Sequence, residues 1–388
     1  MSKTMKLDDI AKIERGRFSP RPRNDPRYYG GDIPFVQTGD VSRSGTYILE
    51  YSQTLNEEGL AVSKLFPKDT ILMTIAANIG DVSILNFDSA GPDSLVAFTP
   101  KEGVSNKWLF HVLSTMKNKF DSLSTQNAQK NLSLEKIKPV KVQVPSYEAQ
   151  VDMASTFDAW DLAIEKTEEL IDAKERQFGW LQKSVLDDVF KSYNCHLSDY
   201  AGIMKHQKIE DVGKLKPLTV KLHCKGIEPN ERDMQITLSK KGRPYFQRVT
   251  GEFLIGRQNF HNGGFGIVPE RLDGFIASNA ITTLEIDKAK LDPRYLFYFF
   301  SRKDYYLRIG HIMDGTGQRE LSDKQIMKLP VSIPNLEKQK EVVALLDTAQ
   351  QEINLLKKLA DQYRTQKRGL MQKLPSGEWH IKNKEAAA

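Results

Sequence analysis

The chain contains few cysteines and no long hydrophobic run. Cys195 and Cys224 are the only cysteines among 388 residues, which is too few for a disulfide framework, and they lack the spacing of metal ligands. No apolar stretch approaches the roughly 20 residues that cross a bilayer, and the first residues contain no hydrophobic core of a signal peptide. We therefore expect a soluble protein located in the reducing cytoplasm.

The sequence also lacks the short motifs of common catalytic sites. It contains no phosphate-binding GxxxxGK[ST] loop, no HExxH zinc motif, no CxxC pair and no GxSxG nucleophile elbow. The Asn-Pro-Pro-aromatic tetrapeptide with which amino-methyltransferases hold a flipped base is absent as well. Seven histidines are scattered along the chain, and His111 falls in an amphipathic segment where a structural role is expected. We predict a non-catalytic chain that carries no cofactor and no metal.

What the sequence does contain is an internal duplication. Residues 131–181 and 320–370 align without a gap at an offset of 189, and residues 6–13 (KLDDIAKI) resemble residues 196–203 (HLSDYAGI). A repeat of this length at a fixed offset indicates two copies of one structural unit. The chain is also longer than one hydrophobic core usually supports. The identical pairs include Leu132/Leu321, Ser133/Ser322, Pro145/Pro334, Gln150/Gln339 and Asp158/Asp347.

Each copy is predicted to end in a long amphipathic helix. The first runs from residue 148 for about 43 residues, or roughly 64 Å, and its apolar side chains recur at heptad spacing apart from Thr167 and Lys174. Pro145 and Pro334 mark the places where the two helices begin. The residues assigned to the seam between the helices are Met153, Phe157, Trp160, Ile164, Ile171, Val342, Leu346, Ile353, Leu356 and Leu370.

Charge and connectivity predict that these two helices pair with each other in antiparallel orientation. Residues 148–176 contain nine acidic and three basic side chains, whereas residues 337–373 contain five acidic and eight basic ones. The alternative is that these charges form only solvated faces. About six residues link the first helix to the second copy and reach at most roughly 20 Å, whereas a parallel pair would need a return of some 60 Å. We expect an antiparallel coiled coil with pseudo-twofold symmetry and one globular unit at each end.

The globular parts are predicted to be α+β domains. Residues 34–40 (PFVQTGD) are typical of a buried strand that runs into a glycine turn, and residues 70–76 of a second strand that ends before 78–81 (NIGD). Residues 252–257 and 280–286 are the expected strands of the second copy, and one helix is expected around Trp108 and another around Tyr295. The predicted division is 1–147 and 192–335 for the globular domains, 148–191 and 336–374 for the helices, and 375–388 for a tail.

Basic residues are concentrated in loops of both copies. Residues 15–27 contain five arginines, three prolines and one acidic residue, and a series of lysines follows between residues 205 and 241 of the second copy. Lysine and arginine that neutralise phosphates release counterions, so such loops favour contact with a polyanion. A solvated basic loop would explain either cluster alone. Two clusters, one in each copy, favour a nucleic-acid partner.

A second pair of loops places a glutamine before a cation. Residues 126–131 (QNAQKN) and 315–320 (GTGQRE) occupy equivalent positions, just before the repeated Leu-Ser. Glutamine can contact adenine with two hydrogen bonds, and lysine or arginine can contact guanine or a phosphate. The alternative is that these side chains only satisfy turn carbonyls. The candidate DNA-binding residues are Arg15, Arg17, Arg21, Arg23, Thr38, Asp40, Arg43, Asn78, Gln126, Asn127, Gln129, Lys130, Lys240, Lys241, Arg243, Arg257, Asn259, His261, Asn279, Thr316, Gln318 and Arg319.

In combination, these features resemble the DNA specificity subunit of type I restriction-modification systems, over nearly the whole chain. The resemblance depends on the tandem units, on PFVQTGD at Pro34 and NIGD at Asn78, on the glutamine-cation turns, and on the helix starts VPSYEAQ (144–150) and IPNLEKQ (333–339). The second copy departs from the first because it has no evident counterpart of PFVQTGD.

The resemblance implies a mechanism. Each globular unit would be a target recognition domain that reads one half of a bipartite, asymmetric DNA sequence in the major groove, and the helix pair would set the gap between the halves. Half-sites contacted from one face of DNA lie about 34–36 Å apart. Two modification methyltransferase subunits, which carry S-adenosylmethionine, would bind the outer faces of the helices, and restriction translocase subunits would join them. The chain itself would be catalytically silent.

Three alternatives are retained. The chain could be the specificity subunit of a type IIB-like system, which would share the recognition mechanism. It could be a fused methyltransferase or nuclease, although the missing motifs argue against an enzyme. It could also be a coiled-coil interaction scaffold that does not bind DNA, which would explain the duplication but not the paired basic loops.

Overall fold

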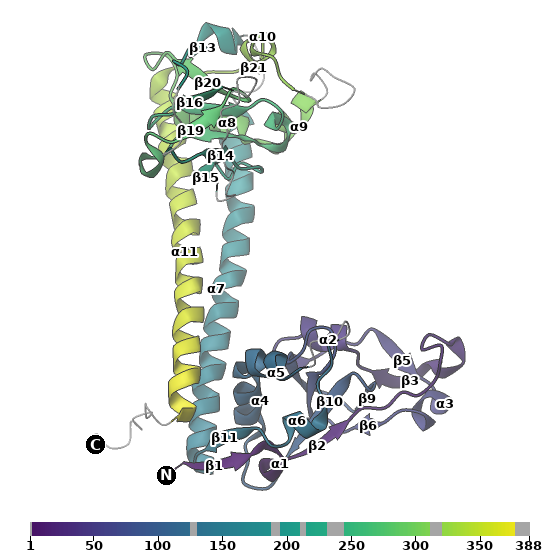
Figure 1. Cartoon of the computed structure of the whole chain (residues 1–388). Helices are drawn as coiled ribbons and strands as arrows, with labels where there is room; N and C mark the ends of the chain where they lie inside the picture. Colours follow the sequence, from purple (N-terminus) through teal and green to yellow (C-terminus); the bar gives the residue numbers. More distant parts are fainter. Residues whose placement is uncertain are drawn as a thin grey trace, which may run out of the picture. The chain divides into compact units, whose positions relative to one another are not determined.

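The computed structural model describes residues 2–124, 130–187, 195–209, 215–230, 244–310 and 320–376. The chain forms two compact units: the first unit contains Met1–Glu168 and Lys358–Ala388, and the second contains Glu169–Lys357. Two long helices, α7 (Tyr147–Asp187) and α11 (Leu336–Ser376), each contribute to both units (Figure 1). No helix among the described residues has the length and apolar content of a membrane span.

The globular part of the first unit contains two sheets. In the larger sheet the order is β2-β10-β7-β8-β4, with only the β4–β8 pair parallel, and in the smaller it is β5-β3-β9-β6. Strands β1 (Lys3–Lys6) and β11 (Lys141–Val144) pair antiparallel. The remaining strands are β2 (Ala11–Arg15), β3 (Tyr29–Phe35), β4 (Tyr47–Ile48), β5 (Gln53–Leu55), β6 (Leu65–Phe66), β7 (Ile71–Thr74), β8 (Val82–Leu85), β9 (Ser89–Ala90) and β10 (Leu95–Pro100). The short helices are α1 (Leu7–Ile10), η1 (Pro26–Tyr28), α2 (Thr38–Arg43), α3 (Glu57–Ala61), α4 (Asn106–Thr115), α5 (Lys117–Leu123) and α6 (Leu134–Ile137).

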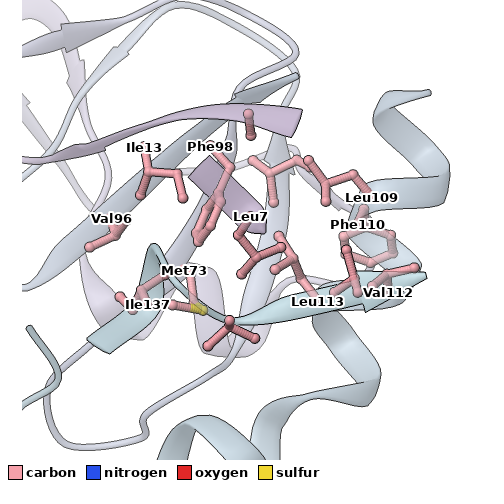
Figure 2. Close-up of a cluster of buried hydrophobic side chains, with 14 of the residues drawn as sticks. Leu7, Ile13, Met73, Val96, Phe98, Leu109, Phe110, Val112, Leu113 and Ile137 are labelled. Atoms are coloured by element: carbon pink, nitrogen blue, oxygen red, sulfur yellow. The ribbon is translucent and has the colours of Figure 1, made fainter. Parts of the chain in front are cut away.

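The core of the first unit lies between the larger sheet and helix α4. Alternate side chains of β2, β7 and β10 point to one face of the sheet, where they meet the apolar face of α4. Ile13, Met73 and Phe98 from these strands pack with Leu109 and Leu113 of α4 (Figure 2). Burial of such side chains fixes the strand register, because a slip of one residue would turn them to the other face.

The second unit repeats this plan with shorter strands. Its four-stranded antiparallel sheet has the order β13-β20-β17-β18, which matches β2-β10-β7-β8, and β12 pairs with β21 as β1 pairs with β11. The strands are β12 (Cys195–His196), β13 (Ala201–Ile203), β14 (Leu218–Val220), β15 (Ile227–Pro229), β16 (Tyr245–Gln247), β17 (Phe253–Gly256), β18 (Phe265–Ile267), β19 (Ile276–Ser278), β20 (Ile281–Ile286) and β21 (Pro330–Val331). The helices are η2 (Leu197–Asp199), η3 (Phe260–Asn262), η4 (Glu270–Leu272), α8 (Pro293–Phe300), α9 (Lys303–Ile309) and α10 (Asp323–Met327). Two tandem α+β domains with the same sheet order agree with the predicted duplication.

The predicted strands at 70–76, 252–257 and 280–286 correspond to β7, β17 and β20, and the predicted helices around Trp108 and Tyr295 are α4 and α8. The prediction of a glycine turn at residues 34–40 is wrong. Strand β3 ends at Phe35, and helix α2 begins at Thr38. The carboxylate of Asp40 explains this, since it accepts hydrogen bonds from the Gln37 backbone N–H (2.9 Å) and from Ser52 Oγ (3.0 Å). It therefore caps the helix from its third residue.

Helices α7 and α11 run antiparallel within each unit. In the first unit Asp161 pairs with Lys367 and Glu168 with Arg364, so that later residues of α7 contact earlier residues of α11. In the second unit Glu175 pairs with Lys357 at 2.6 Å. These ion pairs place the acid on α7 and the base on α11, as the charge pattern predicts. Lys174, one of the two interruptions of the heptad pattern, forms the reverse pair with Glu352 at 2.8 Å.

The seam residues do not all face the other helix. Met153 and Phe157, near the start of α7, belong to the core of the first unit, and Val342 and Leu346 belong in the same way to the core of the second. Ile171 and Ile353 are also buried, whereas Trp160, Ile164, Leu356 and Leu370 are half-buried. The apolar stripe of each helix therefore packs partly against the other helix and partly on globular cores, as Phe157 and Leu186 of α7 do at its two ends.

Candidate nucleic-acid interface

Three loop segments of the first unit meet in one groove. We define the first groove by its lining residues, which enclose about 550 Å³: Arg15, Arg23, Ala76, Ala77, Asp93, Ser94, Lys130 and Asn131. It lies at the end of β2, beside the loop after β7 and the turn before β10. Three separately predicted regions, namely the arginine-rich segment, the loop that contains Asn78 and the glutamine-cation turn, thus contribute to one surface.

Close backbone contacts hold these segments together. The backbone N–H groups of Gly16 and Arg17 donate to the carbonyls of Leu95 and Gly91, each at 2.9 Å. A Cβ atom on Gly16 would lie 2.1 Å from the carbonyl oxygen of Pro92, so only glycine permits this approach. On the other side of the groove, Leu132 N–H donates to the carbonyl of Ile75 at 3.0 Å.

Asp93 contacts two of the arginines in the first groove. Arg23 Nη2 donates to both carboxylate oxygens of Asp93, at 2.8 and 3.1 Å, and Arg15 Nε donates to the Asp93 carbonyl at 2.5 Å. Lys130 lies 3.3 Å from the carboxylate of Asp121, outside the groove. The lining therefore combines three cationic side chains with one carboxylate, a balance that attracts phosphate.

The second unit has a groove of about 580 Å³ in the corresponding place. Ile13 of β2 lies opposite Phe98, and Ile203 of β13 lies opposite Leu284, so Arg15 matches Lys205 and Asp93 matches Asn279. The hydrogen bond from Leu321 N–H to the Arg257 carbonyl (3.0 Å) likewise matches that from Leu132 to Ile75. The lining residues, which define the second groove, are Ile203, Met204, Lys205, His206, Phe246, Arg248, Arg257, Asn279, Ile281, Thr282, Thr283 and Asp323.

A buried arginine distinguishes the second groove from the first. Arg248 is 1% exposed and donates to Thr283 Oγ1 (2.7 Å) and to the Ile281 carbonyl (2.9 Å). Burial lowers the pKa of Arg248 to about 10, which leaves it charged at neutral pH. Burial also raises the pKa of Glu252, and burial together with the nearby Arg248 lowers the pKa of His206. The guanidinium of Arg248 therefore contributes a positive charge to the lining of the second groove.

Arg257 and Asn279 were predicted from the sequence and line the second groove. Arg257 Nη2 forms an ion pair with Glu320 at 2.8 Å, and its Nε donates to the Leu321 carbonyl at 3.0 Å. Asn279 is exposed at the turn before β20. Asn259 is exposed at the start of η3, and His261 lies within η3, where Nε2 is 3.1 Å from Asn262 Nδ2. Neither of these two lines the groove.

The other predicted residues of the described part of the first unit do not line the first groove. Asp40, 3% exposed, is occupied as the cap of α2 and pairs with Arg43 at 2.6 Å, so the interpretation of Asp40 as a DNA contact is replaced by a structural role. Arg17 donates to the Ser63 carbonyl at 2.8 Å, and Arg21 to the Pro20 carbonyl at 2.8 Å. Neither arginine lines the first groove. Thr38 is half-buried in α2, and Asn78 is exposed between β7 and β8.

Part of the predicted site lies outside the described residues. It comprises the candidate residues of the two glutamine-cation turns other than Lys130, and the basic residues before Pro244. These are Gln126, Asn127, Gln129, Lys240, Lys241, Arg243, Thr316, Gln318 and Arg319. Sequence reasoning did not identify Asp93, Ser94, His206 or Arg248. The match of Asp93 to Asn279 depends on the registers of β10 and β20, and the sequence contains no signal for the burial of Arg248.

Comparison with known proteins gives consistent results. The model of the type I restriction modification DNA specificity domain matches residues 2–175 and again residues 182–362. The MjaIX specificity subunit of a type I restriction enzyme from Methanocaldococcus jannaschii is 28% identical over 193 residues, which are 48% of this chain and 42% of that protein. The MjaX specificity subunit of the same organism is 21% identical over 97% of this chain and 93% of its own length.

Solved structures show the same fold. The crystal structure of a type I restriction-modification S subunit from M. genitalium superposes with a TM-score of 0.56 at 12% identity and covers 98% of this chain and 97% of its own. At this identity the likeness concerns the fold alone. Because the family model matches the chain in two consecutive segments, the chain belongs to the family of type I restriction-modification DNA specificity domains and carries two such domains in tandem.

Proposed function

We propose that this chain is the sequence-specific DNA-binding subunit of a type I restriction-modification complex, and that each groove reads one half of a bipartite, asymmetric target. One observation carries the proposal: a basic groove occupies the same position in both units, but its other side chains differ. Cations supply affinity for any DNA through phosphate contacts. Base-edge hydrogen bonds supply the sequence preference, so unlike side chains read unlike half-sites.

The helix pair has a separate role in this proposal. By the sequence argument, the lengths of α7 and α11 set the gap between the half-sites, which must suit major-groove contacts about one helical turn of DNA apart. The ion pairs between the helices in each unit support a stiff connection. The gap is therefore a property of the helices, whereas the half-site sequences are properties of the grooves.

We further propose that the chain has no catalytic activity of its own. Two modification methyltransferase subunits would bind S-adenosylmethionine and the outer faces of the helices, and restriction translocase subunits would join them in the cytoplasm. Exposed apolar side chains on the helices support such binding, including Leu162 in the first unit and Trp180 and Leu355 in the second, which are 55%, 68% and 67% exposed. A type IIB-like system would use the same contacts.

The salt dependence of DNA binding tests the proposal. If the basic residues of the grooves contact phosphates, the logarithm of the binding constant of the full chain for duplex DNA should fall steeply with the logarithm of salt concentration, with a slope near −0.9 per contact. A slope near zero would contradict DNA binding and favour the interaction scaffold. Methyl transfer by the isolated chain with S-adenosylmethionine would contradict the non-catalytic role and favour the fused enzyme.

A further inference from the structure

The carboxylate of Asp93 is an unexpected group in the first groove. Its side chain is 34% exposed and stands among Arg15, Arg23 and Lys130, on the surface that is proposed to face DNA phosphates. A negative charge at this place weakens attraction for a polyanion. The Asp93 carboxylate therefore has a role other than increasing the affinity for DNA.

The contacts of Asp93 suggest that role. Its two oxygens accept hydrogen bonds from one terminal nitrogen of Arg23, and its carbonyl accepts one from Nε of Arg15. Nη2 of Arg21 lies farther from the carboxylate, at 3.9 Å. A guanidinium has five N–H donors in a rigid plane. Among the described residues, the rest of the Arg23 guanidinium is not hydrogen-bonded, so a two-donor edge remains available. The O6 and N7 acceptors of guanine fit such an edge.

We propose, on the basis of the proposed function, that Asp93 is a positioning residue that orients Arg23 to read a guanine in the half-site of the first unit. The hydrogen bonds fix a long side chain before DNA arrives, which removes part of the entropy cost of ordering it on binding. Arg15 is fixed by the same turn through the Asp93 carbonyl. One residue thus sets the geometry of two cationic groups.

The second groove lacks this arrangement. Asn279 occupies the place of Asp93, and an uncharged amide cannot accept the same two charge-assisted hydrogen bonds from an arginine. The arginines of the second groove are held by other partners: Arg248 by Thr283 and Ile281, and Arg257 by Glu320. The inference therefore applies to one half-site, and the other serves as an internal control.

The test is selection of bound DNA from a pool of duplexes with randomised sequence, using the full chain. The variants are Asp93→Asn, which removes a charge, and Arg23→Lys, which keeps one. The matched controls are Asp25→Asn and Arg27→Lys, which make the same changes of charge at an ion pair outside the first groove. The unchanged chain should enrich a guanine at one position of one half-site. Both groove variants should lose that preference by roughly tenfold to a hundredfold, with the other half-site unaltered and the controls unaffected.

The affinity of each variant for an unselected duplex distinguishes loss of the guanine preference from a general loss of DNA binding. Asp93→Asn should bind it as well as or better than the unchanged chain, because a negative charge has left the groove, and Arg23→Lys should keep the same salt slope. Retention of the guanine preference in Asp93→Asn, or an equal loss at every position, would overturn the inference while leaving DNA recognition intact. Failure of the unchanged chain to enrich any sequence would overturn the proposed function as well. If Asp93→Asn does not fold, Arg23→Lys alone tests the inference, because lysine keeps the positive charge but lacks the planar pair of N–H donors of a guanidinium.

Discussion

Two buried glutamines connect each long helix to the domain before it. Gln150 accepts a hydrogen bond from Ser105 N–H (2.8 Å) and donates to the Pro145 carbonyl (3.0 Å). Gln339 repeats this contact with Asp292 N–H (2.7 Å) and the Pro334 carbonyl (2.8 Å). Both side chains are fully buried. The alignment of the two copies detects these glutamines as a repeated pair, but only the structure shows that they join loop to helix.

Replacement of Gln150 by alanine should therefore destabilise the first unit. The change leaves the half-buried Ser105 N–H and Pro145 carbonyl without these partners, at a cost of about 1 kcal/mol for each group, the lower end of the range for buried groups. The matched control is Gln143→Ala, because Gln143 makes an exposed hydrogen bond to Thr4 Oγ1 at 2.9 Å, and its loss should change the free energy of unfolding by less than about 0.5 kcal/mol. Urea unfolding measures both, and equal effects would refute the connecting role.

His111 in the first unit and Tyr298 in the second contact the same aspartate position with different side chains. His111 is buried and its Nε2 lies 3.0 Å from Asp158 Oδ1. In the second unit Tyr298 donates to the matching Asp347 at 2.7 Å. Burial lowers the pKa of His111, opposed by the hydrogen bond to Asp158, and the nearby Lys367 lowers it further. The expected structural role of His111 is thus supported, and it is linked to a titration.

This titration predicts a loss of stability on acidification. Because the pKa of His111 is lower in the folded state, the unfolded chain takes up the proton first as pH falls below about 6.5. The stabilisation from neutral His111 is complete above that pH and declines as pH falls towards the folded-state pKa. His111→Gln should reduce the difference in unfolding free energy between pH about 7.5 and 5.5. His206, whose pKa is also lowered, titrates in both proteins. An unchanged difference would contradict this assignment.

At the residue scale, the sequence predicted the cations of the first groove but not their arrangement. Arg15 and Arg23 stood out because basic residues cluster in a proline-containing loop, and Lys130 because it follows Gln129 in one of the paired glutamine-cation turns. Asp93 did not, because an acid before a strand is typical of any turn. Asp40 was misassigned for a related reason, since a helix cap and an exposed loop acid look alike until the backbone N–H groups around them are known.

At the element scale, the two long helices were predictable because their signals are long. Heptad spacing, the duplicated start motifs and opposite charge extend over dozens of residues. Helix α2 was not predictable, because its few residues are stabilised by the buried cap Asp40 rather than by periodicity. The sequence also did not show that some seam residues pack on a domain core and others on the other helix. An apolar stripe looks the same in both cases.

Charge reversal tests the pairing of the helices. Lys357→Glu would place two acids together at the position of the Glu175–Lys357 pair, and should lower the unfolding free energy by up to about 1 kcal/mol, as for exposed pairs. Adding Glu175→Lys should restore most of the loss, because the pair is re-formed in reverse. Lys340→Glu on the exposed face of α11 is the control and should have a smaller effect. A double-mutant cycle with no coupling energy would show that this ion pair does not stabilise the helix pair.

At the scale of the whole molecule, the proposal separates the gap from the half-sites. Insertion of one heptad into both helices, near Ile171 and near Leu356, preserves the seam and adds about 10 Å of helix. The selected DNA should then show the same half-sites with a gap longer by about three base pairs, at 3.4 Å each.

A control insertion of the same length in the loop around Gly103, where a side chain would meet open space, should leave the gap unchanged. An unchanged gap after the double helix insertion would mean that the helices do not set it. Changed half-site sequences would mean that the grooves and the helices are not independent.

The duplication could be recognised from sequence at this scale because both copies keep the helix starts and the Leu-Ser turns. The correspondence of the two grooves could not, because it depends on strand register. Asn279 matches Asp93 only when β13 and β20 are superposed on β2 and β10. Strands this short carry too little sequence pattern to be aligned without the structure.

Mapping of methylated bases in the DNA of the host cell tests the central claim most directly. The proposal predicts methylation at a target with two different half-sites separated by a gap of fixed length, one half changing when Arg23 of the first groove is replaced and the other when Arg257 of the second is replaced. A continuous or palindromic target, or replacements that alter both halves together, would contradict the assignment of one half-site to each groove.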